Sequence, residues 1–495
     1  MKLVEQRRTG ALFFFHHVSL CCTHQGEYSM TNYCPGDIGH LKAACSHDEI
    51  RWLLNEEDMS KTGEKLIEKI KNNPQYFNAL VDLFESTCEL NNQYCQKIAA
   101  IRPFGLTMEE LQKKMEDGLV LYQKIWATGL FAEPIDFHLS PLLKEHLKKI
   151  GISEKESAGI ISKMTSPLED TFSRSAEKSI LKIAAEIQKQ KISFQKARKQ
   201  PKIKQMIQEH YDKYYWSACN YFSFSGLGAE SIEGLIQAAL KQKGGAQKTL
   251  KEMEEQKIEL IKEKEKLKNK FTFDEDTKLA FKLMEKAGIV YDKRKKSQMN
   301  TFFSLGRILK EIAKRKKIDF DLAKYLLPHE LKDFTRGKIK IQTLKDRRKY
   351  TFIDFNKTPY EILTLDAAKK AEEDIWKHTD LTQNKKEISG LCASEGRVIA
   401  KARIISSVKN LGELKQGEIL VTGMTTPDYA VALKKAVGII TDDGGITCHA
   451  AIIAREMKIP AIVGTKTATK KVKTGDLIDL RAHHGMARIL ETTSE

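Results

Sequence analysis

Prolines are scarce in this sequence, with 11 among 495 residues. Between the prolines of the N-terminal part, apolar residues recur at spacings of three and four, as on one face of an α-helix. Seven residues near its start show the pattern: Leu66, Ile67, Ile70, Phe77, Leu80, Val81 and Phe84. We therefore predict an all-α region over residues 56–337. Its prolines are expected between the helices: Pro74, Pro103, Pro134, Pro141, Pro167 and Pro201.

Long hydrophobic runs are also absent. The longest, residues 10–22, contains His16 and His17 and is shorter than the about 20 residues that a membrane-spanning helix needs. Arg7 and Arg8 precede this run, but no small-residue cleavage site follows it, so we do not interpret it as a secretory signal. The hydrophobic share of 41% is typical of a soluble globular chain. We predict no association with a membrane.

The nine cysteines form no recognisable disulfide or metal-binding motif. Four of them lie in residues 1–50 together with five histidines, but neither a CxxC nor an HxxxH pair occurs there. We therefore expect an irregular extension over residues 1–55 and no metal site. Scattered thiols are typical of a reducing compartment, so we predict a cytoplasmic protein.

Acidic residues do not balance the basic ones. The chain has 83 lysines and arginines against 66 aspartates and glutamates, which gives a net charge of +17. Such an excess suits a nucleic acid, an anionic substrate or a solvated basic surface. Since the excess is mostly lysine spread through helical segments, we favour the solvated surface, with phosphorylated ligands as specific partners. The aromatic stretch 211–224 lacks arginine, so we do not expect a nucleic-acid partner.

The end of the helical region carries three further patterns. Residues 246–270 are almost all Lys, Glu and Gln with a thin apolar seam, which predicts a long helix that is either solvated or used in oligomerisation. Residues 338–353 alternate like strands, and a helix is expected over residues 359–376. We assign residues 338–390 as a connecting segment. Its last part, residues 383–390, reads as a linker that reaches at most about 28 Å when extended.

From residue 391 the pattern changes to short strands separated by helices. Seven strands are expected, over residues 396–400, 402–405, 418–421, 438–440, 461–463, 477–480 and 487–490. Helices are expected over residues 427–435 and 448–457. Residues 391–495 thus predict a compact α/β domain of about 100 residues, a normal size for one core. The chain is expected to be multidomain, with a large all-α region followed by this domain.

Residues 444–455 of this domain combine a glycine pair with a helix start. Gly444 and Gly445 follow a strand and let the backbone approach a ligand closely. The first N–H groups of a helix lack partners within it, and the helix dipole favours negative charge there, so this place suits a phosphate group. His449 stands at that place, and its neutral imidazole can attack phosphorus to form a phosphoramidate.

This segment resembles the signature of the phosphoenolpyruvate-utilising enzymes, among them pyruvate phosphate dikinase, phosphoenolpyruvate synthase and rifamycin phosphotransferase. The signature is a Gly-Gly pair, any residue, Thr, any residue, His, small residues, two aliphatic residues, a small residue and Arg. Residues 444–455 meet each element, and the flanking residues 417–428 and 456–464 are similar as well. The resemblance covers about residues 391–490 and implies a swivelling phosphohistidine domain of β/β/α type.

The resemblance also implies roles for individual residues. His449 would be the phosphorylated, catalytic residue. The phosphate would be held by four residues: Gly444, Gly445, Thr447 and Cys448. Three more are possible supporting residues: Thr426, Asp443 and Arg455. Arg455 lies nearly two turns along the helix from His449, so a packing role fits it equally well.

Several parts of a complete family enzyme are not found in this sequence. No region resembles the nucleotide-binding ATP-grasp domain, no Gly-x-x-x-x-Gly-Lys-Ser/Thr motif occurs, and no pyruvate-handling barrel is expected. The family's Asp-Gly-x-x-Gly turn is replaced by residues 481–485, which read Arg-Ala-His-His-Gly. The resemblance therefore implies a separate ATP-grasp-type partner. That partner would hold Mg²⁺ and ATP or phosphoenolpyruvate, and we expect no cofactor to be bound firmly by this chain.

Two functions are compatible with these patterns. In the first, the chain is a phosphotransferase component, and His449 carries a phosphoryl group from the partner to a small-molecule acceptor at the helical region. In the second, the chain is a non-catalytic interaction protein that is switched by phosphorylation of His449. The complete signature favours the first. The sequence identifies neither the acceptor nor the oligomeric state, and an oligomer stays open.

Overall fold

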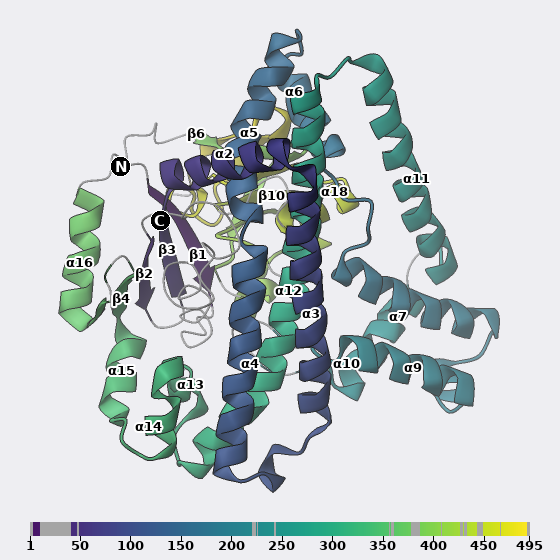
Figure 1. The fold of residues 1–495 in the computed structure, drawn as a ribbon. Helices are drawn as coiled ribbons and strands as arrows, with labels where there is room; N and C mark the ends of the chain where they lie inside the picture. Colours follow the sequence, from purple (N-terminus) through teal and green to yellow (C-terminus); the bar gives the residue numbers. More distant parts are fainter. Residues whose placement is uncertain are drawn as a thin grey trace.

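The chain folds into a large helical region and a C-terminal α/β domain, as the sequence predicted (Figure 1). The computed structural model describes residues 3–9, 41–46, 49–219, 224, 226–241, 244–355, 357, 361–377, 387–406, 408–425, 429, 433–442, 449–465 and 467–492. Within these residues, no helix combines the length and the apolar character that crossing a membrane requires.

Five long helices form a bundle at the centre of the helical region. They are α2 (Glu56–Asn72), α3 (Pro74–Ala100), α4 (Met108–Gly129), α5 (Ala132–Lys149) and α12 (Glu275–Arg315). Helix α12 is the longest and contacts α3, α4 and α5 (Figure 1). Local sequence sets the helix starts. Thr107, for example, caps α4 through a reciprocal pair of hydrogen bonds with Glu110.

Two prolines that were expected between helices lie inside one. Pro134 and Pro141 both belong to α5. Pro134 falls in the first turn, where the backbone N–H has no partner in the helix, so it removes no hydrogen bond. Pro141 lies further along and does remove one. The helix persists there because Leu139 and Leu143, on either side of Pro141, are buried in the bundle core.

A second group of helices lies beside the bundle and has its own core (Figure 1). It comprises α7 (Phe172–Lys189), α8 (Phe194–Ala197), α9 (Pro201–Tyr214), α10 (Ala229–Leu240) and α11 (Ala246–Lys270), and α6 (Glu154–Met164) precedes it. Helix α11 confirms the long helix predicted over residues 246–270. Leu250 and Met253 of its apolar seam pack into this core, and the buried Lys264 pairs with Glu285 of α12. Much of the seam is therefore used within the chain.

The prediction of an irregular extension over residues 1–55 is wrong for the described residues. β1 (Leu3–Thr9), β2 (Leu41–Ser46) and β3 (Glu49–Asn55) join β4 (Thr351–Asp354) and β5 (Glu361–Thr364) in one antiparallel sheet. The strand order is β1-β3-β2-β4-β5. Because β2 pairs with β4 from the far end of the helical region, no local pattern indicates this sheet.

The connecting segment also differs in part from prediction. After α13 (Phe320–Ala323) and α14 (Leu331–Thr335), the chain forms α15 (Ile341–Lys349) where strands were expected, and only β4 is extended. Leu344 and Arg347 are the buried side chains of α15, at a helical spacing of three. Helix α16 (Leu365–Lys377) covers most of the predicted helix 359–376. Of the predicted linker, residues 387–389 form β6, and residues 383–386 lie outside the described residues.

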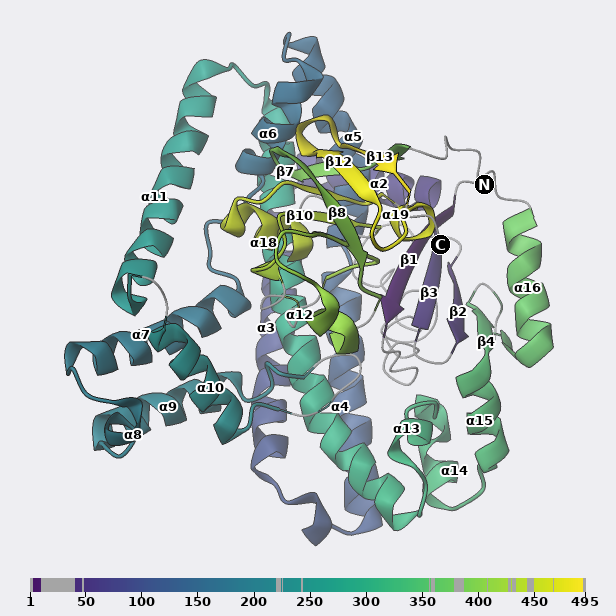
Figure 2. The same ribbon diagram turned by 180° about the vertical axis from the view of Figure 1, so that it is seen from behind.

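The C-terminal domain is built on an eight-stranded sheet of order β6-β13-β12-β8-β9-β10-β11-β7 (Figure 2). Its strands are β6 (Glu387–Ser389), β7 (Leu391–Ser394), β8 (Arg397–Ile404), β9 (Ile419–Thr422), β10 (Gly438–Thr441), β11 (Ala461–Val463), β12 (Leu477–Arg481) and β13 (Met486–Glu491). Neighbours from β8 to β11 are parallel and the other pairs are antiparallel. Alternate residues of the central strands enter two separate cores, Leu420 one and Val421 the other.

One detail of this domain corrects a prediction, and a second describes the turn whose sequence departs from the family's. The strands predicted over residues 396–400 and 402–405 are one strand, β8. Residues 397–401 pair with β12 and residues 402–404 with β9, and this change of partner interrupts the apolar alternation. The turn at residues 481–485 is a short 3₁₀ helix, η5 (Ala482–His484), closed by Gly485 at a φ of 62°. Glycine is favoured there because this left-handed conformation strains other residues.

Candidate active site

The candidate site lies where the parallel strands β9, β10 and β11 end at one edge of the sheet. Strand β10 ends at Thr441, and helix α18 (His449–Met457) begins at His449. The strand before the motif and the helix after it are therefore both present. The four residues that were expected to hold the phosphate lie outside the described residues, and so do two of the three possible supporting residues: Gly444, Gly445, Thr447 and Cys448, and Thr426 and Asp443.

Asp442 is the residue that directly follows β10, and its side chain is firmly held. Its side chain is buried and accepts hydrogen bonds from Thr465 Oγ1 at 2.8 Å and from the backbone N–H groups of Ala468 and Thr469 at 2.5 and 3.2 Å. The hydroxyl of Thr469 donates to it as well. These donors belong to the loop after β11 and to α19 (Ala468–Lys471). The carboxylate thus ties the end of β10 to the chain that follows β11.

Backbone hydrogen bonds join the three strand ends directly. Asp442 N–H donates to Thr422 O at 3.1 Å, and Thr465 N–H donates to Thr441 O at 3.0 Å. Next to them, the hydroxyls of Thr422 and the buried Tyr429 lie 3.3 Å apart. This network joins the ends of β9, β10 and β11 to one another.

The sequence did not identify this network as part of the site. Asp442 was not among the candidate site residues. Its actual partners come from a loop more than twenty residues later, which no local spacing reveals. The run of threonines at residues 465, 467 and 469, two of which donate to Asp442, was the available signal.

Helix α18 is held against the sheet by small and branched side chains. Ala450, Ala451, Ile453 and Ala454 are buried in the core on that face. Arg455, in the last turn, donates through Nη1 to Ala393 O of β7 at 3.2 Å. Its position is six residues from His449, or about 9 Å along the helix axis. The structure thus gives Arg455 a packing contact at the far end of the helix from His449.

One ion pair of the domain joins β8 to the start of β9. Arg403 of β8 donates two hydrogen bonds to Glu418 before β9, at 2.7 and 3.0 Å, and holds the pKa of this carboxyl below its ordinary value.

Among the residues described by the structure, no group of three or more His, Cys, Asp or Glu side chains is placed to hold a metal ion.

The chain is similar to known proteins over its C-terminal part. Residues 414–485 match the family described as "PEP-utilising enzyme, mobile domain". A probable phosphoenolpyruvate synthase of Archaeoglobus fulgidus is 44% identical over 118 residues, which are 24% of this chain and 15% of the relative. Phosphoenolpyruvate synthase of Aquifex aeolicus is 43% identical over 103 residues, or 21% of this chain and 12% of the relative.

These similarities have a limited extent. The chain spans no more than about a seventh of the length of these two relatives. Among solved structures, the holo form of aconitase X from Thermococcus kodakaraensis matches 21% of this chain and 98% of its own, at 22% identity and a TM-score of 0.18. Because this TM-score is low, the sequence matches and not the solved structure characterise the domain.

Proposed function

We propose that this chain is a phosphotransferase component that carries a phosphoryl group on His449, because residues 414–485 match the family described as "PEP-utilising enzyme, mobile domain". A neutral imidazole nitrogen of His449 attacks the phosphorus of the donor, and the bond from phosphorus to the donor oxygen breaks. The ring gives up its N–H proton. In delivery, the P–N bond breaks as phosphorus bonds to an acceptor oxygen, which loses its proton, and the imidazole takes up a proton again.

The observation that carries this proposal is the place of His449 in the fold. It is the first residue of α18, and the parallel strand β10 ends at Thr441, eight residues before it. The unpaired N–H groups of the first turn and the helix dipole favour the charge of a phosphoryl group there. Asp442 and its threonine partners hold the strand end that leads into the turn.

We further propose that a separate ATP-grasp-type protein supplies the phosphoryl group and holds Mg²⁺ with ATP or phosphoenolpyruvate. The helical region would receive a small-molecule acceptor. The support is chemical: loading and delivery need two different pockets, and a carrier domain that moves between them keeps water away from each. The net charge of +17 suits phosphorylated ligands.

The test is labelling of the full chain with ³²P. One arm uses labelled phosphoenolpyruvate and the other uses labelled ATP with an ATP-grasp protein. We expect label that is stable to base and labile to acid, that is lost in His449→Ala and that is retained in the control His329→Ala. Label that forms but is passed to no small molecule would refute the transferase and favour a phosphorylation switch. Absence of label with either donor would refute both.

A further inference from the structure

The helical region and the C-terminal domain meet without sharing a hydrophobic core. The buried apolar residues of the bundle form one cluster, and those of the C-terminal domain form two others. Among the described side chains, Leu391 of β7 alone packs against both the bundle cluster and a cluster of the domain. An interface with so little shared apolar packing resembles the contacts between domains that move relative to one another.

Small residues of α6 form one part of this interface. Ser162 is buried and donates to Ala393 O of β7 at 3.0 Å. Gly159 lies so close to Glu395 that a Cβ atom there would come within 1.7 Å of the carboxylate. Beside this contact lies an open cleft of about 650 Å³, lined by Ser153, Glu156, Glu395, Gly396, Arg397 and His483. The boundary is thus lined by polar residues beside α6 and is open to water at this cleft.

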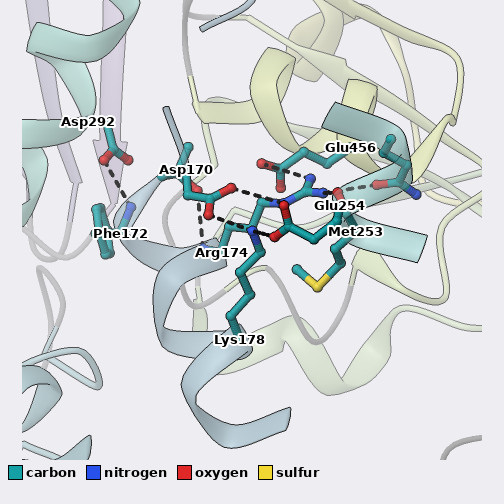
Figure 3. Close-up of polar contacts among 10 residues, drawn as sticks. Asp170, Phe172, Arg174, Lys178, Met253, Glu254, Asp292 and Glu456 are labelled. Carbon is teal, nitrogen blue, oxygen red and sulfur yellow. Dashed lines mark hydrogen bonds and ion pairs between the residues drawn. The ribbon is translucent and has the colours of Figure 1, made fainter. Parts of the chain in front are cut away.

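A charged contact forms the second part (Figure 3). Glu456, in the last turn of α18, lies 3.5 Å from Arg174 near the start of α7. Arg174 also donates to Met253 O at 2.8 Å and to Gln256 Oε1 at 3.1 Å in α11. Since these bonds fix the guanidinium within the helical region, it is a preformed site for the carboxylate of Glu456.

Two other carboxylates lie beside this site. Asp170 is 3.5 Å from Arg174 and accepts from Lys178 at 2.6 Å. Asp292 of α12 accepts the N–H of Phe172, the first residue of α7, at 3.0 Å (Figure 3). Asp292 and Glu456 are therefore acidic groups on opposite sides of the interface that face the same end of α7.

The charges around Asp292 come from each element packed against it. Burial raises the pKa of Asp292 to about 7, and the negative charge of Glu456 adds to the rise. Lys293 and Lys296 of the same helix and the N–H of Phe172 oppose it. Burial likewise raises the pKa of Glu456, and the negative charge of Glu177 adds to the rise, whereas Arg174 and Arg455 oppose it. Near neutral pH, loss of a proton from Asp292 places a second negative charge beside Glu456.

A second ion pair crosses the interface nearby. Lys434, between β9 and β10, lies 3.4 Å from Glu177 of α7. Both side chains are largely exposed, at 58% and 42%, so this pair adds little hold of its own.

We propose that β7 and the C-terminal end of α18 form a reversible docking surface for α6 and α7 of the same chain. The ion pair between Glu456 and Arg174 stabilises the docked state, and this ion pair weakens as Asp292 loses its proton. The inference rests on the proposed function, since a phosphoryl carrier has to leave one pocket to reach another. It adds the surface from which the domain departs and the condition that releases it.

The experiment measures the shape of the full chain by small-angle X-ray scattering at pH 6 and pH 8. Two variants should disrupt the docking surface. Glu456→Arg places a second cation opposite Arg174, and Ser162→Phe inserts an aromatic ring between α6 and β7. We expect the ratio of docked to released chain to fall about tenfold in each at pH 6. The matched controls, Glu491→Arg on an exposed strand end and Ser86→Phe on the exposed face of α3, should scatter like the wild type.

The wild type itself should expand from pH 6 to pH 8, and Asp292→Asn should remove this response. Circular dichroism confirms that each variant is folded, and either surface variant alone is sufficient for the test. Unchanged scattering in the folded surface variants, or a wild type already extended at pH 6, would overturn the proposal. Labelling of His449 in the same samples separates the two hypotheses. If the scattering changes as expected but His449 takes up no label, the carrier function is refuted and the docking surface remains supported.

Discussion

Removing the Asp442 carboxylate should loosen the edge of the sheet from which the His449 turn starts. Asp442 is buried, and four donors converge on it: Thr465 Oγ1, the N–H groups of Ala468 and Thr469, and Thr469 Oγ1. In Asp442→Ala these donors lose their acceptor, and α19 loses the group that caps its first turn.

The size of the effect follows from this geometry. One hydrogen bond to a charged acceptor contributes about 1.5–3 kcal/mol, so four independent bonds would contribute about 6–12 kcal/mol. The four are not independent, because two come from Thr469, which is partly exposed and can turn to water. We expect Asp442→Ala to destabilise this part of the domain by about 3–4 kcal/mol. Thr465→Val, which removes one donor, should destabilise it by about 1–1.5 kcal/mol.

Native-state hydrogen exchange, read by mass spectrometry, is the suitable assay, because a multidomain chain does not unfold in two states. The opening free energy of peptides that cover β11 and α19 is compared between the wild type and each variant. Asp366→Ala is the matched control, since Asp366 is 99% exposed at the start of α16. A change below about 0.5 kcal/mol in Asp442→Ala would refute the reasoning, because the network would then contribute no more than a surface contact.

Three further changes test other parts of the structure. Gly485→Ala should destabilise the C-terminal domain by about 2 kcal/mol or more, because the backbone at position 485 is left-handed and a Cβ there would lie 2.4 Å from a backbone carbonyl oxygen. Calorimetry measures this change, and Gly412→Ala, which has open space around it, is the control. Glu133→Gln should lower the free energy of unfolding, measured in urea, by about 3 kcal/mol, because it removes the carboxylate that pairs with the buried Arg294. The free energy of unfolding should fall from pH 5 to pH 8 in the wild type, by at most about 1.4 kcal/mol per pH unit below pH 7, and less in Asp292→Asn; the melting temperature, which falls with it, is the measurement.

The sign of this pH dependence follows from the direction of the shift. Burial raises the pKa of Asp292 from its ordinary value of 3.8 to about 7. The folded state therefore holds the proton more tightly than the unfolded state does. This contribution is complete below the ordinary pKa and is lost as the pH rises through 7. A melting temperature that rises over the same interval would show that Asp292 is charged in the native chain.

The parts of the structure that the sequence predicted are those encoded by short stretches. Strand β10 and helix α18 follow from an apolar run, a glycine pair and small residues that are contiguous in the chain. Helix α11 follows in the same way from its composition. The sheet of β1 to β5 could not be predicted, because β2 gains its partner β4 only after the whole helical region has folded between them. Asp442 was missed for the same reason, since its donors lie in a later loop.

Errors within the predicted elements have equally specific causes. Pro141 was expected to end a helix, yet the buried leucines around it keep α5 continuous. The stretch before β4 alternates in hydropathy, but its buried pair Leu344 and Arg347 follows the helical spacing. An arginine counts as polar in a hydropathy pattern even when it is buried against a carboxylate, as Arg347 is against Glu330. The pattern therefore gave the wrong periodicity.

The two ends of α18 serve different contacts on one side of the helix. Positions 449, 452 and 456 are three and seven residues apart and so share a side. The core of the C-terminal domain contains Ala450, Ile453 and Ala454. Ile452 is also buried, but it belongs to neither hydrophobic cluster of that domain. Glu456 contacts Arg174 of α7. The side of α18 that bears position 449 is thus the side that turns toward the helical region.

On the proposed function, the docked arrangement is therefore the one for delivery, and loading by the partner requires release. Glu456→Arg should then slow the transfer of the phosphoryl group from His449 to the acceptor about tenfold and leave the rate of labelling by the donor unchanged or higher. Rapid-quench measurement of labelled protein, with donor removed before acceptor is added, reads the two steps separately. Equal loss of both steps would mean that Glu456 supports the fold of α18 rather than the docked state. Loss of labelling alone would assign the docked state to loading instead.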